Sequence, residues 1–77
     1  MKVEITLFGQ LVDIVRTNKL HLQDIPDTDS LQRILHEKYP ALSNLSYSIA
    51  VNKKTIHENT ILDEDANVAF LPPFSGG

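Results

Sequence analysis

The residues best suited to chemistry lie at the end of the sequence, where Phe74 and Ser75 are followed by Gly76 and Gly77. Glycine has no side chain, so this segment could enter an active site that is too narrow for any other residue. The chemical group that it would present there is a carboxylate at Gly77. The alternative interpretation is a frayed terminus, which is common at the ends of domains.

Two prolines precede this segment. Pro72 and Pro73 fix the backbone angle φ and donate no backbone hydrogen bond, so they cannot continue a central strand. They favour a stiff, extended conformation instead. We therefore predict a folded domain over residues 1–71 and an extended C-terminal arm over residues 72–77.

No other group of residues indicates a site for catalysis or metal binding. The chain has no cysteine, which excludes disulfides, thiolate metal sites and a cysteine nucleophile. The acidic run over residues 63–65 lacks the glycine and the final ligand of a calcium loop, so we predict a solvated turn. The histidines lack the paired spacing of a metal site, and we predict surface or rim positions for His21, His36 and His57. We expect no metal, no bound cofactor and no active site within this chain alone.

Length and charge narrow the class of protein. The 77 residues are enough for one small domain, and 42% apolar residues is an ordinary supply for its core. The net charge is −3, whereas nucleic-acid binding needs a basic face, so we expect a basic protein surface as the partner. No apolar run reaches the roughly 18 residues of a membrane-spanning helix, and no signal-peptide pattern is present. We expect a cytoplasmic protein.

Hydrophobic periodicity predicts the elements that must position the arm. Residues 2–8 alternate between apolar and polar side chains, which indicates a half-buried strand. Residues 28–38 carry one apolar stripe between Asp27, a good N-cap, and Pro40, which ends a helix. The predicted set is strands over 2–8, 20–23, 47–51, 55–57 and 67–71, helices over 11–15 and 28–38, an irregular stretch over 41–46, and turns over 52–54 and 63–65.

This order of elements predicts a two-layer α+β domain, in which a mixed sheet carries one main helix on one face. The last strand would return beside the first strand and run parallel to it. This is the β-grasp, or ubiquitin-like, arrangement, and it would place both chain ends on central strands.

One apolar patch is predicted to lie outside the core. Phe8 falls, by strand parity, on the polar face of the first strand. If the last strand buries its other face, Ala69 and Leu71 point outward beside Phe8, and Phe74 follows on the arm. Exposed apolar patches on small domains usually mark a partner site. The alternative is that Phe8 folds over an edge of the core.

The sequence ANVAFLPPFSGG, residues 66–77, resembles the ending of one known family. This is the MoaD group of the MoaD/ThiS ubiquitin-like sulfur carriers, the small subunits of molybdopterin synthase. Residues 7–10 (LFGQ) are similar to the family's opening Phe-Ala-Gln or Phe-Ala-Arg, and residues 50–52 (AVN) to its Ala-Val-Asn strand end. The order of predicted elements fits the family across nearly the whole chain.

The resemblance implies a sulfur-carrier function. A ubiquitin-activating-like adenylyltransferase would use ATP to adenylate the Gly77 carboxylate, and a sulfur donor protein would displace AMP to leave a thiocarboxylate. The arm would carry this sulfur into the large synthase subunit, which gives it to cyclic pyranopterin monophosphate in molybdenum cofactor biosynthesis. In the family, two small and two large subunits form a heterotetramer. The implied threading residues are Phe74, Ser75 and Gly76, and the implied interface residues are Phe8, Ala69, Leu71, Pro72 and Pro73.

The chain also departs from the family pattern. Gly9 replaces a usual alanine, Val12 stands where arginine is frequent, Asp13 replaces glutamate, and Glu64 replaces a turn glycine. These changes concern the first helix and one turn, so they bear on surface contacts and not on the arm. The alternatives are a carrier for thiamine biosynthesis or tRNA thiolation, a lysine modifier like ubiquitin, and a plain interaction module. The thiamine carrier usually lacks the diproline that this chain has.

Overall fold

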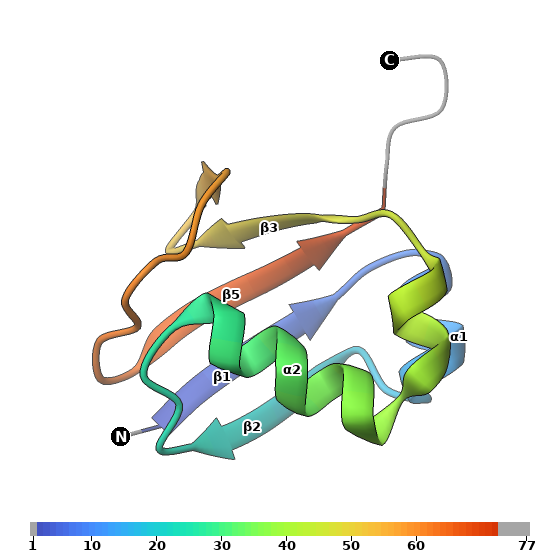
Figure 1. The fold of residues 1–77 in the computed structure, drawn as a ribbon, viewed down its shortest axis with the longest axis horizontal. Helices are drawn as coiled ribbons and strands as arrows, with labels where there is room; N and C mark the ends of the chain where they lie inside the picture. Colours follow the sequence, from blue (N-terminus) through green and yellow to red (C-terminus); the bar gives the residue numbers. More distant parts are fainter. Residues whose placement is uncertain (1, 73–77) are drawn as a thin grey trace.

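The computed structural model describes residues 2–72. None of the helices in this range is long and apolar enough to cross a membrane. The elements, which Figure 1 shows along the chain, are β1 (Lys2–Leu7), α1 (Gln10–Val15), β2 (Lys19–Gln23), α2 (Thr28–Lys38), the 3-10 helix η1 (Pro40–Asn44), β3 (Ser48–Val51), β4 (Lys54–Ile56) and β5 (Ala66–Leu71).

The strands form one mixed sheet in the order β2-β1-β5-β3-β4. β1 pairs antiparallel with β2 and parallel with β5, and β5 pairs antiparallel with β3. The first and last strands therefore lie side by side and run in the same direction (Figure 1). The predicted β-grasp topology is confirmed.

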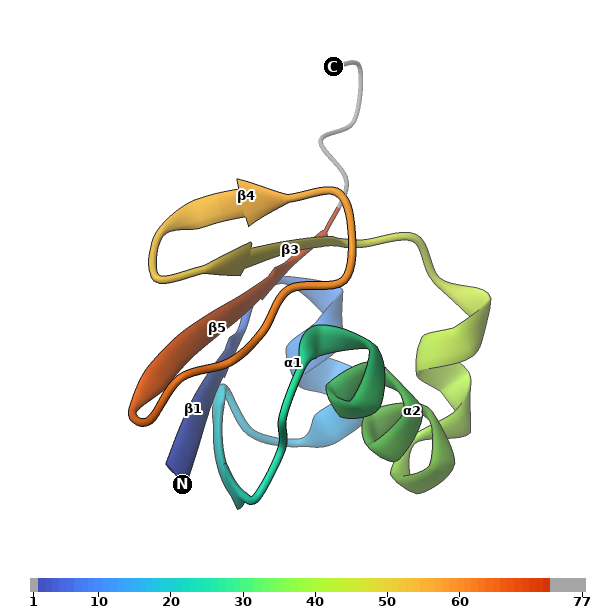
Figure 2. The same cartoon turned by 60° about the vertical axis from the view of Figure 1, so that its left-hand side comes forward.

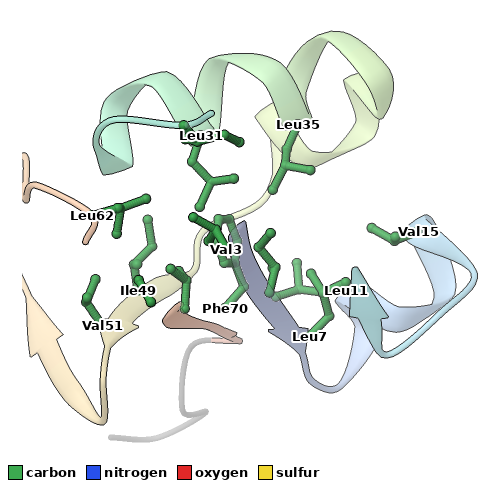
Figure 3. Packing of buried hydrophobic residues seen from close by; sticks show 14 of the residues in the cluster. Val3, Leu7, Leu11, Val15, Leu31, Leu35, Ile49, Val51, Leu62 and Phe70 are labelled. Atoms are coloured by element: carbon green, nitrogen blue, oxygen red, sulfur yellow. The ribbon is translucent and has the colours of Figure 1, made fainter. Parts of the chain in front are cut away.

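The core lies between the sheet and α2, which crosses one face of the sheet (Figure 2). Every second residue of β1 and β5 points into this core, as does one stripe of α2 (Figure 3). Leu11 and Val15 of α1 extend the same core toward the end of the sheet where β1 and β5 finish. The fully buried side chains of β1, β5 and α2 include Val3, Ile5, Val68, Phe70, Leu31 and Leu35.

The segment after α2 is more regular than predicted. Residues 40–44 form a 3-10 helix, so the predicted irregular stretch is wrong there. Pro40 occupies its first turn, where a preset φ favours helix initiation, and the Ser43 hydroxyl donates to the Pro40 carbonyl at 2.7 Å. Leu42 is fully buried. This burial depends on packing against distant elements, which local sequence does not reveal.

The β3–β4 hairpin is tighter than predicted. Its turn consists of Asn52 and Lys53 alone, at φ values of 50° and 72°, as in a two-residue type I′ turn. Asn52 ties this turn to β5, because its N–H donates to the Asn67 carbonyl at 2.7 Å and its Oδ1 accepts from the Asn67 N–H at 3.0 Å. His57 therefore follows β4 and is not part of it. The other strand ends agree with the prediction or differ from it by one residue.

The start of α2 is held by a polar network. Asp27 is the N-cap, as predicted, and its carboxylate accepts from the Ser30 N–H at 2.9 Å and from Asn59 Nδ2 at 3.2 Å. The hydroxyl of Thr28, which is 1% exposed, accepts from the Thr60 N–H at 2.9 Å. The loop before β5 is therefore fastened to the first turn of α2. The hydrogen bonds from Ser30 are the main reason why the pKa of Asp27 lies below its ordinary value.

This lowered pKa predicts a pH-dependent contribution to stability. The folded state favours the ionised Asp27, so its contribution is complete above the unfolded pKa and is lost as pH falls through the lower folded pKa. We expect Asp27→Asn, which can still accept from Ser30, to be less stable than wild type near neutral pH. The difference in free energy of unfolding between wild type and Asp27→Asn should narrow below about pH 3.8. Urea unfolding from neutral pH to below pH 3.8 measures this difference. A difference that is independent of pH would contradict the lowered pKa of Asp27.

Candidate functional site

The clearest surface feature lies where β5 ends. Ala69 and Leu71 point away from the core and are partly exposed, and Phe8 is 44% exposed. Pro72, also partly exposed, is the last residue that the structure describes. We call Phe8, Ala69, Leu71 and Pro72 the exit surface. Phe8 is exposed as predicted, whereas its role in partner binding, and the alternative that it folds over an edge of the core, stay predictions.

Strand pairing brings the two halves of the exit surface together. The parallel register sets Leu7 of β1 beside Phe70 of β5, so Phe8 follows alongside Leu71. The Phe8 N–H donates to the Phe70 carbonyl at 3.2 Å, which extends the ladder by one bond beyond the strand. The backbone of Phe8 is thus fixed while its side chain remains in solvent. An exposed aromatic ring on a fixed backbone is well suited to act as a binding anchor.

The outer face of the sheet, on the side away from α2, carries both small and charged side chains. Near the exit surface, Ala69 pairs with Thr6 on β1 and with Ala50 on β3. All three side chains are small. At the other end, Glu4 lies 3.5 Å from the Lys19 ammonium and 3.4 Å from His21 Nε2. Lys19 pairs with Thr6 in the row of Ala69, and His21 pairs with Glu4 in the row of Asn67, so charged side chains lie along the β1–β2 side of the outer face.

The half-buried Tyr47 ring contacts Phe70, a core residue that lies between Ala69 and Leu71 on β5. The Tyr47 ring stacks on Phe70, with centroids 5.0 Å apart, and its hydroxyl donates to Gln32 Oε1 at 3.0 Å. His36 Nε2 lies 2.6 Å from the same hydroxyl. Burial raises the pKa of Tyr47, which keeps the phenol neutral and able to donate. The sequence analysis missed this network, because its three polar groups are separated along the chain and only folding brings them together.

The predicted residues of the arm beyond Pro72 are not placed by the structure, whereas the histidines, which were not predicted to form a site, are. Pro73, Phe74, Ser75, Gly76 and Gly77 lie outside the described residues, so the domain boundary and the threading and carrier roles stay predictions. His21 and His57 are exposed, and His36 is half-buried on α2. Among residues 2–72, no three carboxylate or histidine side chains come close enough to hold a metal ion.

A family profile and a curated relative both match this chain over nearly its whole length. Residues 5–77 match the profile of the ThiS family. The chain is 30% identical over 83 residues to the molybdopterin synthase sulfur carrier subunit of Caenorhabditis briggsae, in an alignment that covers 100% of this chain and 99% of the relative.

Solved structures agree with the sequence comparison. Subunits 1 and 2 of the molybdopterin-converting factor of Helicobacter pylori 26695 have been solved as a complex, and the matching chain is 30% identical with a TM-score of 0.77 and full coverage of both chains. The small archaeal modifier protein 1 of Methanosarcina acetivorans is 26% identical, with a TM-score of 0.85 over 99% of this chain and 96% of that protein. The full-length coverage means that the likeness includes the whole domain and not one motif.

Proposed function

Because the chain belongs to the ThiS family, we propose that it is the sulfur carrier subunit of a molybdopterin synthase. The observation that carries this proposal is the exit surface, which places exposed apolar side chains where β5 passes into the Pro-Pro-Phe-Ser-Gly-Gly segment. A carrier needs both parts together, since the docking surface must bring the arm to its partner's active site. The similarity to one subunit of a two-subunit converting factor supports the same function.

The proposed chemistry takes place at the Gly77 carboxylate. A carboxylate is a poor electrophile, so it first attacks the α-phosphate of ATP on an activating adenylyltransferase and releases pyrophosphate. A sulfur donor protein then attacks the carbonyl carbon of the acyl-adenylate, and AMP leaves. When the donor is a persulfide, a thiol reduces the resulting acyl disulfide and frees the thiocarboxylate. The product carries a nucleophilic sulfur at the end of the arm, where Gly76 and Gly77 have no side chains.

The proposed partner for sulfur transfer is the large synthase subunit. The exit surface would dock on it, with Phe8 and Leu71 as apolar anchors, and the arm would deliver the thiocarboxylate to cyclic pyranopterin monophosphate. Acid and base groups for the transfer would come from the large subunit. We propose a heterotetramer of two small and two large subunits, and a cytoplasmic location where ATP is available for the first step.

Reconstitution tests this function directly. The protein is incubated with an adenylyltransferase that serves molybdopterin synthase, ATP and a sulfur donor, and its intact mass is measured. We expect a gain of about 16 Da, the replacement of one oxygen by sulfur. Adding the large subunit and the pterin precursor should then return the mass to its starting value as molybdopterin forms. A chain that neither gains mass nor binds the large subunit would contradict the proposal.

A second candidate function is protein modification. It is favoured by the similarity to the small archaeal modifier protein 1 of Methanosarcina acetivorans. A modifier would use the same activated Gly77 carboxylate, but a lysine amine of a target protein would displace AMP and form an amide. The two functions differ in product. Covalent adducts on target lysines, found by peptide mass spectrometry in cells that express a tagged chain, would support the modifier.

A further inference from the structure

A pocket of about 280 Å³ lies between the first turns of α2 and the β3–β4 edge of the sheet. Its lining includes Ile49 and Ile56, which pair across β3 and β4 on the core side of the sheet, and the ring of Tyr47. The volume is below the roughly 300–1,000 Å³ of pockets that hold cofactor-sized ligands. One side chain of a partner protein therefore fits this pocket better than a cofactor does.

Hydrogen bonds hold the walls of this pocket in place. The Tyr47 hydroxyl donates to Gln32 Oε1 at 3.0 Å, which ties the segment before β3 to α2. Asn59 Oδ1 accepts from the Asp29 N–H at 2.9 Å and from the Thr28 hydroxyl at 3.3 Å, which ties the loop after β4 to the same helix. The pocket thus needs little ordering when a ligand enters, and this lowers the cost of binding.

The N-terminus of α2 borders the pocket but does not offer an anion site. The backbone N–H groups of residues 28–30 donate to the Thr60 carbonyl, Asn59 Oδ1 and Asp27 Oδ1, each at 2.9 Å. Anions bind at helix N-termini through N–H groups that have no other partner. Since these three N–H groups are already paired, the pocket disfavours a phosphate or a carboxylate.

The formal charges in the lining are negative. Asp29 and Glu58 line the pocket, and neither carboxylate has a hydrogen bond or an ion pair with any of residues 2–72. Within the same part of the chain, no lysine or arginine contributes to the lining. Arg33, one helical turn after Asp29, lies outside it. The pocket therefore combines an apolar floor with two carboxylates, which favours a cationic group on an apolar stem.

We propose that this pocket binds an arginine side chain of the large synthase subunit. The aliphatic stem would pack on Ile49 and Ile56, and the guanidinium would pair with Asp29 and Glu58. A guanidinium is more weakly hydrated than an ammonium and carries five N–H donors, so arginine suits a partly apolar pocket better than lysine. The net charge of −3 also favours a basic partner surface.

The position of the pocket favours the large subunit as the source of this arginine. Ser48, which lines the pocket, pairs with Leu71 of the exit surface. Because β3 runs antiparallel to both β5 and β4, β4 ends at the same end of the sheet as β5 (Figure 2). A protein that docks on the exit surface could therefore place a neighbouring side chain in the pocket. The inference rests on the proposed function, because it takes the large subunit as the protein that docks there.

A small probe tests the pocket without any partner protein. N-acetyl-arginine methylamide is titrated into the isotope-labelled full-length protein, and backbone amide signals are followed by NMR. N-acetyl-citrulline methylamide, which has a similar shape but no charge, is the control probe. We expect the signals of Gln32, Ile49 and Ile56 to shift with the arginine probe alone, with a Kd in the millimolar range. Equal shifts with both probes, or no shift with the arginine probe, would overturn the inference.

A charge-neutral variant tests the pocket in the complex. Asp29→Asn combined with Glu58→Gln keeps the size of both exposed side chains and removes their charges. We expect the Kd for the large subunit to rise about tenfold at low salt, and the difference from wild type to shrink at high salt. Asp63→Asn combined with Glu64→Gln is the matched control, since it removes the same two charges at exposed positions outside the lining. This control should bind as wild type does.

The outcomes separate the pocket from the carrier function. If wild type binds the large subunit and the pocket variant binds it equally well, the inference is overturned and the carrier function stands. Equal losses in the pocket variant and its control would show a general effect of net charge, and would overturn the inference as well. If wild type neither binds the large subunit nor gains sulfur, the carrier function fails, and the occupant proposed for the pocket fails with it.

Discussion

Deletion of Gly77 is expected to abolish thiocarboxylate formation without unfolding the domain. The deletion leaves a glycine carboxylate at the end of the chain, so the chemical group is conserved and only its reach changes. One extended residue spans about 3.5 Å. A carboxylate displaced by this distance from the α-phosphate of ATP would lie outside the separation of about 3–3.5 Å at which reacting atoms must be held. We expect the activation rate to fall at least about 100-fold.

Two controls accompany this deletion. Gly77→Ala keeps the length and adds one methyl group, so it tests whether the partner's site is too narrow for a side chain. The melting temperature should stay at the wild-type value in both variants, because the core residues lie within residues 3–70. A shortened chain that gains about 16 Da as readily as wild type would refute the role of Gly77.

Phe8→Glu and Leu71→Glu are each expected to weaken binding of the large subunit by ~2 kcal/mol or more, about 30-fold in Kd. Both side chains are apolar, and both lie on the exit surface beside the start of the arm. A carboxylate at either position would lose water on docking without gaining a matched partner. Because Phe8 is already 44% exposed, its replacement should change the stability of the free domain little.

Ile61→Glu is the matched control for these two variants. Ile61 is 70% exposed, so it is another large apolar side chain in solvent. It bridges to Asp27 near the start of α2, away from the exit surface. Titration calorimetry should give the wild-type affinity for Ile61→Glu. Equal losses in all three variants would point to a general effect of added negative charge, and unchanged affinity in Phe8→Glu would exclude the exit surface as the docking site.

Much of the fold follows from local pattern. The alternation in residues 2–7 identifies a strand with one buried face, and Asp27 and Pro40 bracket the main helix, whose bounds of 28 and 38 agree with the prediction. The exposure of Phe8 follows from parity alone, because each residue of a strand faces opposite to its neighbour. The order of the elements along the chain predicted the β-grasp topology, and the resemblance to the MoaD group agreed with it.

Several features were visible only in the folded chain. Sequence analysis treated Gly9 only as a departure from the family's usual alanine, whereas its proximity to Pro72 arises because β1 and β5 finish side by side. Tyr47 was assigned to a strand, yet it stacks on Phe70 and hydrogen-bonds to α2. The 3-10 helix over residues 40–44 was also missed, since it depends on the burial of Leu42.

By itself, the sequence determined which residues face inward, where the main helix begins and ends, and that a Pro-Pro segment with a glycine ending follows the last strand. Only the tertiary structure showed the surroundings of the start of that segment. The ring of Pro72 packs close to Gly9, and the exposed Phe8 lies next to it. The physical reason is the separation along the chain of the residues that determine each feature. Which side of a strand is buried and where a helix is capped depend on residues a few positions apart. The place where the arm leaves the domain depends on the register between the first and last strands, which is a property of the packed sheet.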